Sequence, residues 1–339
     1  MVGCKTLGAW LAKLSLLRTS LAAADKATYT NDTVIAIKAL QTWYNEEEGL
    51  WDTTGWWNSA NVLTMLGDFI NLDSNDANDL DLEDVLATTF TQAQQTSLKA
   101  RKVLTKGLAS RLVESHYTRS PVSSDSDLAT RGYTGFINDY YDDEGWWALA
   151  WIRAYDVTGN NDYLNMAESI FSDMQGGVNG TCGGGIWWSK DRTYKNAIAN
   201  ELYLSVAASL ANRASDADSY LTIAKDQWSW FKNSGMINDN NLINDGLTID
   251  ANGTCTNNGE AEWSYNQGVV LGGLVELYRA TDDSDYLSEA STIASAAIDA
   301  LSEDGILHDG CEPNCGADGS QFKGMLCFHP SRSLVGLFP

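Results

Sequence analysis

A repeated helix start constrains the fold of this chain more than any other feature of its sequence. Three tripeptides join an acid or a serine to Tyr-Leu and recur about sixty residues apart: Asp162-Tyr163-Leu164, Ser219-Tyr220-Leu221 and Asp285-Tyr286-Leu287. The polar residue is suited to cap a new helix, and the Tyr-Leu pair is suited to pack against the helix before it. Repeats at this spacing predict an array of helical hairpins.

Hydrophobic periodicity predicts helices over most of the chain, and no convincing period-2 run predicts a strand. The expected helices are 28–44, 57–71, 83–98, 142–158, 161–174, 194–212, 217–233, 260–280 and 284–302. Segments 142–158, 194–212 and 260–280 are apolar on nearly every side, which is typical of buried helices. The segments that follow them are amphipathic. We therefore expect an all-α fold, a toroid whose buried inner helices end at a central cleft.

One polar stretch, from Lys106 to Thr134, interrupts the helical rhythm. Its serine- and aspartate-rich centre around Pro121 predicts a loop over or beside the cleft rather than a linker between domains. We expect a single domain over residues 25–339.

Composition narrows the class of ligand. The net charge of -23 argues against nucleic acid and anionic membranes as partners, because both attract clustered Lys and Arg. The chain has thirteen tryptophans and fourteen tyrosines, more than a core of this size usually needs. This surplus favours a carbohydrate as the ligand. No GxSxG, P-loop, GxGxxG or HExxH motif is present, and no cofactor or metal is expected. The acidic run at 73–78 lacks the glycine and glutamate of a calcium loop, so it predicts a solvated loop.

Cysteines and glycosylation sequons favour a secreted or cell-wall protein. Cys182, Cys255, Cys311 and Cys315 are the candidate disulfide partners, with the pairing left open, while Cys4 and Cys327 are assigned to a leader and an atypical tail. The sequons place candidate glycans on Asn31, Asn179 and Asn252. Residues 1–24 weakly resemble a signal peptide, with an apolar run interrupted by basic residues and a small-residue site at 22–24. No stretch is long enough for a transmembrane helix.

Adjacent carboxylates stand beside paired tryptophans in residues 138–147, where a loop is expected to become an inner helix. Aromatic faces stack on pyranose rings, and paired acids can cleave a glycosidic bond. The alternative is that Asp142, Asp143 and Glu144 only serve the first turn of a helix, where acids meet the positive end of the macrodipole.

Four motifs resemble glycoside hydrolase family 76, the endo-α-1,6-mannanases. They are Tyr140-Tyr141-Asp142-Asp143-Glu144-Gly145-Trp146-Trp147-Ala148-Leu149-Ala150-Trp151, Cys182-Gly183-Gly184-Gly185-Ile186-Trp187-Trp188, Asn196-Ala197-Ile198-Ala199-Asn200-Glu201 and Trp263-Ser264-Tyr265-Asn266-Gln267-Gly268. The resemblance runs from about residue 28 to Gly324 and is greatest to fungal secreted or wall-anchored members. It implies an (α/α)6 barrel and a retaining mechanism with Asp142 as nucleophile and Asp143 as acid/base.

The resemblance and the aromatic pairs together suggest further contacts with the substrate. The candidates are Trp56, Trp57, Asn58, Asn138, Trp187, Trp188, Asn200, Tyr265 and Asn266. Ring stacking and amide hydrogen bonds to sugar hydroxyls would explain them, and packing within the inner layer would explain the tryptophans equally well.

The expected partner is therefore mannan or a mannose-containing glycan, cut by a monomeric enzyme. One alternative is a transglycosylase that moves such glycans onto wall polysaccharide, because a covalent glycosyl intermediate can be intercepted by a sugar as well as by water. Another is a non-catalytic carbohydrate-binding wall protein. Residues 325–339 depart from the family pattern, and six hairpins need more helices than the periodicity predicts, so we expect the barrel to lack its last helices.

Overall fold

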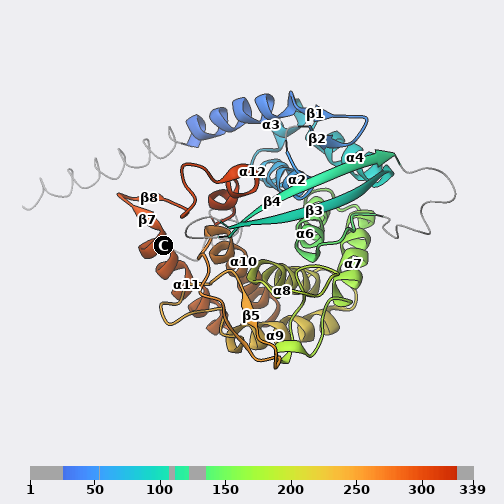
Figure 1. Ribbon diagram of the computed structural model, residues 1–339. Helices are drawn as coiled ribbons and strands as arrows, with labels where there is room; N and C mark the ends of the chain where they lie inside the picture. The colour runs from blue at the N-terminus through green and yellow to red at the C-terminus, as the bar shows by residue number, and fades with distance from the viewer. Residues whose placement is uncertain (1–25, 53, 107–110, 122–134, 327–339) are drawn as a thin grey trace, which may run out of the picture. The chain divides into compact units, whose positions relative to one another are not determined.

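The computed structural model describes residues 26–52, 54–106, 111–121 and 135–326, with side chains outside 95–134. The chain forms two compact units, residues 1–45 and 46–339 (Figure 1). In the first unit, residues 26–41 are helical and β1 spans Tyr44–Asn45. The single domain expected over residues 25–339 stays a prediction. The leader-like residues 1–24, Cys4 and Cys327 lie outside the described residues.

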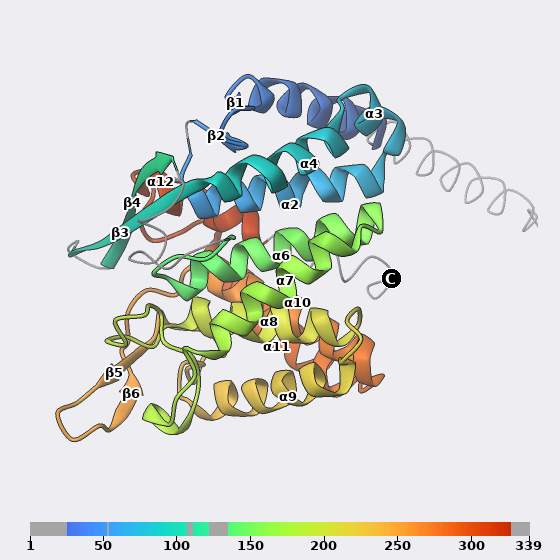
Figure 2. The same cartoon turned by 90° about the vertical axis from the view of Figure 1, so that its right-hand side faces the viewer.

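Four buried helices lie side by side in the second unit: α2 (Trp56–Leu72), α6 (Tyr141–Thr158), α8 (Ala197–Ala211) and α10 (Ser264–Thr281) (Figure 2). We call them the inner helices. Every residue of α8 is buried, which is what an apolar surface on all sides predicts. The first turns of α2 and α6 lie together, because Trp57 stacks on Trp146 with ring centroids 5.7 Å apart. Tyr265, in the first turn of α10, has its pKa raised by burial and by the charges of acids that include Asp142 of α6 and Glu201 of α8. The inner helices therefore bring their N-terminal ends to one end of the unit.

Three amphipathic helices each pack on the inner helix before them: α7 (Asn161–Gln175) on α6, α9 (Ala217–Asn233) on α8, and α11 (Asp285–Leu301) on α10. These pairs are the hairpins that the repeat predicts, so the all-α expectation of paired inner and outer helices is confirmed. The capping detail differs. The cap of α7 is Asn160, whose side chain accepts from the Asp162 amide at 3.0 Å. Tyr163 packs on Trp151 of α6 as expected.

Smaller elements join these helices. They are β2 (Leu50–Trp51), α3 (Ser74–Asp79), α4 (Leu82–Gln92), the 3-10 turns η1 (Ala93–Gln95) and η2 (Thr181–Gly183), the strands β5 (Leu247–Ile249), β6 (Cys255–Asn257), β7 (Ser302–Glu303) and β8 (Ile306–Leu307), and α12 (Gly316–Gly319). The acidic run expected to be a loop forms α3, capped by the side chain of Asp73. Residues 322–326 are helical and bring Phe322 onto Tyr265, with ring centroids 4.0 Å apart.

A long β-hairpin corrects two sequence expectations. β3 (Thr96–Lys106) pairs antiparallel with β4 (Arg111–Pro121), from Thr96 opposite Pro121 to Lys106 opposite Arg111. The helix expected over 83–98 ends earlier, at Gln92, and residues 111–121 of the loop expected over 106–134 form a strand. The period-2 signal is weak because basic residues fall on both faces of the first strand, at Lys99, Arg101 and Lys102. Residues 122–134 lie outside the described ranges.

Candidate active site

The acidic-aromatic stretch begins α6 and places its two aspartates in the first turn. Asp143 is fully buried and Asp142 is 7% exposed. Asp142 Oδ2 accepts a hydrogen bond from the indole Nε1 of Trp188 at 3.0 Å, and Asp143 Oδ2 accepts one from Asn138 Nδ2 at 2.7 Å. The N-cap residue is Tyr140, which makes no side-chain capping bond. Each aspartate is thus held by a side chain from another segment, beyond any interaction with the helix dipole.

Asn138 is fixed by its own bonds. Its Oδ1 accepts from the Tyr140 amide at 2.8 Å, and its backbone N–H donates to Glu144 Oε1 at 3.2 Å. The structure brings this predicted site residue against the carboxyl of Asp143. Contact of Asn138 with a substrate stays a prediction.

Glu144 lies behind the pair and is fully buried. Burial raises the pKa of its carboxyl well above the usual range, although the nearby Lys190 ammonium opposes that rise. Lys190 Nζ lies 3.0 Å from Glu144 Oε1 and 2.8 Å from Asp173 Oδ2, which ties α6 to α7. The backbone of Lys190 also donates to the Asp139 carbonyl at 2.9 Å. These contacts anchor the turn that carries the aspartates.

The tryptophans predicted to stack on sugar are buried against other rings. Trp56 lies 5.6 Å from Trp147, Trp57 stacks on Trp146, and Trp188 lies 5.1 Å from Tyr140, all between ring centroids. Packing within the protein therefore accounts for much of their aromatic surface. Stacking on a substrate stays a prediction for all of them, Trp187 and Tyr265 included.

The predicted amide contacts fall into two groups. The side chain of Asn200 is bonded to the backbone N–H and carbonyl of Ile186, to the Asn196 carbonyl and to Gln227. Such an amide holds a loop in place. Asn266 is also fully buried, yet its side-chain nitrogen and oxygen have no hydrogen-bond partner among the described residues, and the same holds for Asn58 Nδ2. Buried amides usually find partners, so these two are suited to sugar hydroxyls.

Two acids near the pair were missed by the sequence reasoning. Glu201 on α8 is fully buried, and neither carboxyl oxygen has a hydrogen-bond partner within the described residues. Asp245 accepts a short hydrogen bond from the Tyr194 hydroxyl. Burial, then the charges of Asp245, Asp142 and Glu201, raise the pKa of Tyr265 well above its usual value, so these acids surround its hydroxyl. The only sequence signal for Glu201 is its place after Asn200 in a resembling motif.

The disulfides have the expected partners. Cys182 pairs with Cys255, and Cys311 pairs with Cys315. The first bond joins the glycine-rich loop before Trp187 to the β5–β6 hairpin. Asn31 and Asn252 are exposed and Asn179 is partly buried, so glycans at these positions stay predictions.

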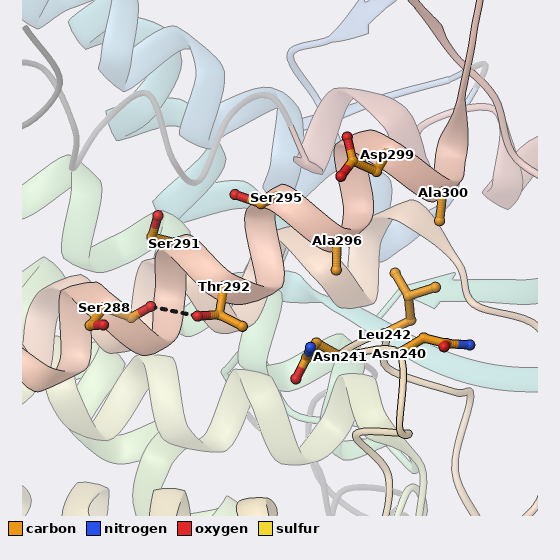
Figure 3. A pocket seen from close by; sticks show the side chains of 10 residues that line it. All are labelled: Asn240, Asn241, Leu242, Ser288, Ser291, Thr292, Ser295, Ala296, Asp299 and Ala300. Atoms are coloured by element: carbon orange, nitrogen blue, oxygen red, sulfur yellow. Dashed lines mark hydrogen bonds between the residues drawn. The ribbon is translucent and has the colours of Figure 1, made fainter.

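The central cleft also stays a prediction. An open pocket of about 830 Å³ lies elsewhere, between residues 240–242 and the outer face of α11 (Figure 3). Its lining is mixed, with serine, threonine and asparagine side chains beside leucine, alanine and one aspartate. None of its lining residues is a predicted site residue. Within the described ranges, no three His, Cys, Asp or Glu side chains gather in a way that could hold a metal ion. No described helix is long and apolar enough to cross a membrane.

Comparison with known proteins decides the family. The model of glycosyl hydrolase family 76 matches residues 22–329. The chain belongs to glycosyl hydrolase family 76. Among relatives of this family 76 chain, a mannan endo-1,6-alpha-mannosidase of Saccharomyces cerevisiae is 30% identical over 200 residues, which cover 54% of this chain and 43% of the relative. One from Candida albicans is 29% identical over 202 residues, covering 54% and 44%. The chain spans about half the length of the curated relatives it matches.

Solved structures of family 76 share the fold. An α-1,6-mannanase of Salegentibacter sp. HEL1_6, solved with α-1,6-mannotriose, superposes with a TM-score of 0.68 at 20% identity, covering 89% of this chain and 79% of that one. Dfg5 of Chaetomium thermophilum, solved with glucosamine, gives 0.63 at 20% identity, covering 83% and 64%. The helical hairpins are those of the (α/α)6 barrel that the resemblance implies.

Proposed function

We propose that this chain is an endo-acting glycoside hydrolase that cleaves α-1,6-mannosidic linkages of mannan with retention. Asp142 is the nucleophile and Asp143 the acid/base. The observation that carries the proposal is the buried pair of consecutive aspartates, each held by a different neutral donor, Trp188 for one and Asn138 for the other. Two carboxyl groups with separate partners are suited to separate roles.

The two steps follow from these roles. The Asp142 carboxylate attacks the anomeric carbon as the glycosidic C–O bond breaks, and Asp143 gives its proton to the departing oxygen. Asp143, now a carboxylate, takes a proton from water. The resulting hydroxide displaces Asp142 from the anomeric carbon, which restores both side chains. The indole N–H of Trp188 keeps the attacking carboxylate oriented, and Asn138 does the same for the proton donor.

A relative supports the choice of residues. The Salegentibacter α-1,6-mannanase was made inactive by replacing two consecutive aspartates with asparagine. This chain has two such pairs, Asp142-Asp143 and Asp282-Asp283. The second pair is exposed where α10 ends, so the buried pair is the one that fits an active site.

The exposed pair supplies a matched control for the test. Asp142→Asn and Asp143→Asn should each lower turnover of α-1,6-mannooligosaccharides by about a thousandfold or more, because each removes a reacting group. Asp282→Asn should leave turnover unchanged. Oligosaccharide chromatography measures the rates, and NMR of the first product gives its anomeric form. Full activity in either buried variant would refute the site, and an inverted first product would refute retention.

Transfer to a sugar acceptor is a second candidate, favoured by the glucosamine complex of the related Dfg5. An acceptor bound beside the glycosyl intermediate would take the place of water. Incubation of the enzyme with α-1,6-mannan and a wall glucan or chitin oligosaccharide separates the two reactions by mass spectrometry. Mixed mannose-acceptor products indicate transfer, and free mannooligosaccharides alone indicate hydrolysis.

We also propose a secretory destination, supported by the two disulfides and by the exposed sequons at Asn31 and Asn252. Disulfides of this kind form and persist in oxidising compartments. Expression through a eukaryotic secretory pathway, followed by endoglycosidase treatment, should reduce the apparent mass. An unchanged mass would contradict glycosylation at both asparagines.

A further inference from the structure

Lys195 is a fully buried cation just before α8. Its Nζ points into the glycine-rich loop and donates to the carbonyls of Thr181 at 2.8 Å and Gly185 at 2.9 Å, with the carbonyls of Gly184 and Asn179 also within reach. The rings of Trp187 and Trp230 flank it, with centroids 4.9 and 5.8 Å from Nζ. Backbone carbonyls and aromatic faces are surroundings that stabilise an ammonium group.

The backbone of the loop is shaped for this contact. Cys182, Gly183, Gly184 and Gly185 have successive φ values of 59°, 75°, 147° and 77°. Such φ values are costly for residues with a side chain but accessible to glycine. In this loop they direct several carbonyls toward one point. Without a central cation these carbonyls would face one another in a buried site, where unpaired acceptors are costly.

The same loop leads directly to the proposed nucleophile. Ile186 is bonded through its backbone to Asn200, and the Trp188 amide donates to the Tyr194 carbonyl at 2.8 Å. The Trp188 carbonyl then accepts from the Tyr141 amide at 2.9 Å, while the Trp188 indole donates to Asp142. The geometry of residues 179–188 therefore sets where the Trp188 N–H meets the carboxylate.

We propose that Lys195 is a positioning residue, an internal cation that organises residues 179–188 and so delivers the Trp188 N–H to Asp142. The Lys195 ammonium is surrounded by backbone carbonyls in the way that a bound metal ion can be. Its kinetic consequence rests on the proposed function, whereas its effect on the loop does not. Burial lowers the pKa of the Lys195 ammonium to about 8, so the group is charged at the neutral and acidic pH of the tests below.

Hydrogen exchange tests the effect on the loop without any substrate. Lys195→Met keeps the apolar stem and removes the charge and the donors. We expect the amides of residues 179–188 to exchange at least tenfold faster than in the wild type, because the carbonyl cage loses its centre. Lys232→Met, which removes an exposed lysine of α9 paired with Glu289, is the control and should change nothing in this segment. Unchanged exchange in Lys195→Met would overturn the proposal.

A double-mutant cycle tests the route to Asp142. Lys195→Met should lower kcat on α-1,6-mannooligosaccharides about tenfold or more with a smaller change in KM, since the disturbed contact serves the reacting carboxylate. In a Trp188→Phe background, which already lacks the N–H, the same change should cost less than about threefold. Equal losses in both backgrounds would mean that Lys195 acts by another route and would overturn the proposal.

Chemical rescue separates the cation from the bulk of the side chain. In Lys195→Ala, added propylammonium should restore exchange protection of residues 179–188, folding where it is lost, and kcat. Tetramethylammonium or KCl at equal concentration should not, and rescue by all three salts alike would contradict an ammonium-specific cage. A wild-type enzyme that turns over no α-1,6-mannan refutes the proposed function, and the exchange results then still decide the role of Lys195.

Discussion

The surroundings of the buried Glu201 carboxyl disfavour its charged form. This carboxyl is fully buried within α8, close to the acid Asp245, and burial raises its pKa well above the ordinary value. The folded protein therefore keeps a proton that the unfolded chain releases near the ordinary glutamate pKa of 4.5. The free energy of unfolding is therefore not reduced by Glu201 below that pH. It falls as the pH rises toward the raised pKa of the folded state, because only the unfolded chain then releases the proton.

A glutamine at this position should remove that pH dependence. At pH 7 the Glu201→Gln variant should be more stable than the wild type by at least about 1.4 kcal/mol, the equivalent of one pKa unit. The gain should shrink near pH 4, where both states of the wild type hold the proton. Urea unfolding at the two pH values measures the difference. Glu303→Gln, on an exposed strand end, is the control, and a gain for Glu201→Gln that is independent of pH would contradict the assignment.

Part of the site can be predicted from the sequence at this scale. The adjacent aspartates, the helix start that holds them and the neighbouring tryptophans all carry local signals. A lysine or a glutamate in a stretch expected to be helical is usually exposed. Nothing local therefore marks Lys195, and Glu201 is marked only by its place after Asn200 in a resembling motif. The contacts that distinguish them come from other segments, namely the carbonyls of the glycine-rich loop for Lys195 and, in addition to burial, the charge of Asp245, which raises the pKa of Glu201. Contact of Asn200 with a substrate stays a prediction, and in the structure its amide is hydrogen-bonded to Ile186, Asn196 and Gln227.

At the scale of elements, helix positions followed closely from periodicity. The range expected for α9 agrees to the residue, and α7 and α11 agree within one residue at each end. The β3–β4 hairpin was missed because strand pairing is a contact between segments and its alternation is irregular. The helical hairpins could be predicted more fully than the β-hairpin because they repeat one pattern that is local in the sequence.

The loop before Trp187 gives a prediction for an element. A Cβ at Gly185 would lie 2.2 Å from the ring of Trp230, at a φ of +77°. Gly185→Ala should therefore cost more than about 2 kcal/mol of stability, through strain and overpacking together. Gly180→Ala, where nothing lies within 4 Å of the added carbon, should cost less than about 1 kcal/mol. Thermal unfolding of the two variants measures the losses. Similar losses of stability would show that the Trp230 ring moves aside at little cost.

At the scale of the whole molecule, the two disulfides should differ in how much they contribute to the free energy of unfolding. Cys182–Cys255 spans 73 residues, including α8 and α9, whereas Cys311–Cys315 spans four. Loop-closure entropy gives about 4 kcal/mol for the first and about 2 kcal/mol for the second. Serine at both positions of each pair, followed by denaturant titration, tests the order. A larger loss from the short bridge would mean that local geometry outweighs chain entropy here.

The stacked tryptophan rings along α6, and between α6 and α2, have an optical consequence. Trp147 and Trp151 lie 5.8 Å apart with planes 21° from parallel, and Trp57 and Trp146 lie 5.7 Å apart at 25°. Indoles this close exchange excitation energy, so the near-ultraviolet dichroism of the protein should contain coupled bands rather than a sum of separate chromophores. Three of these four rings lie on α6, the helix that begins with Asp142, so a sugar bound beside that carboxylate should change the spectrum without any added dye.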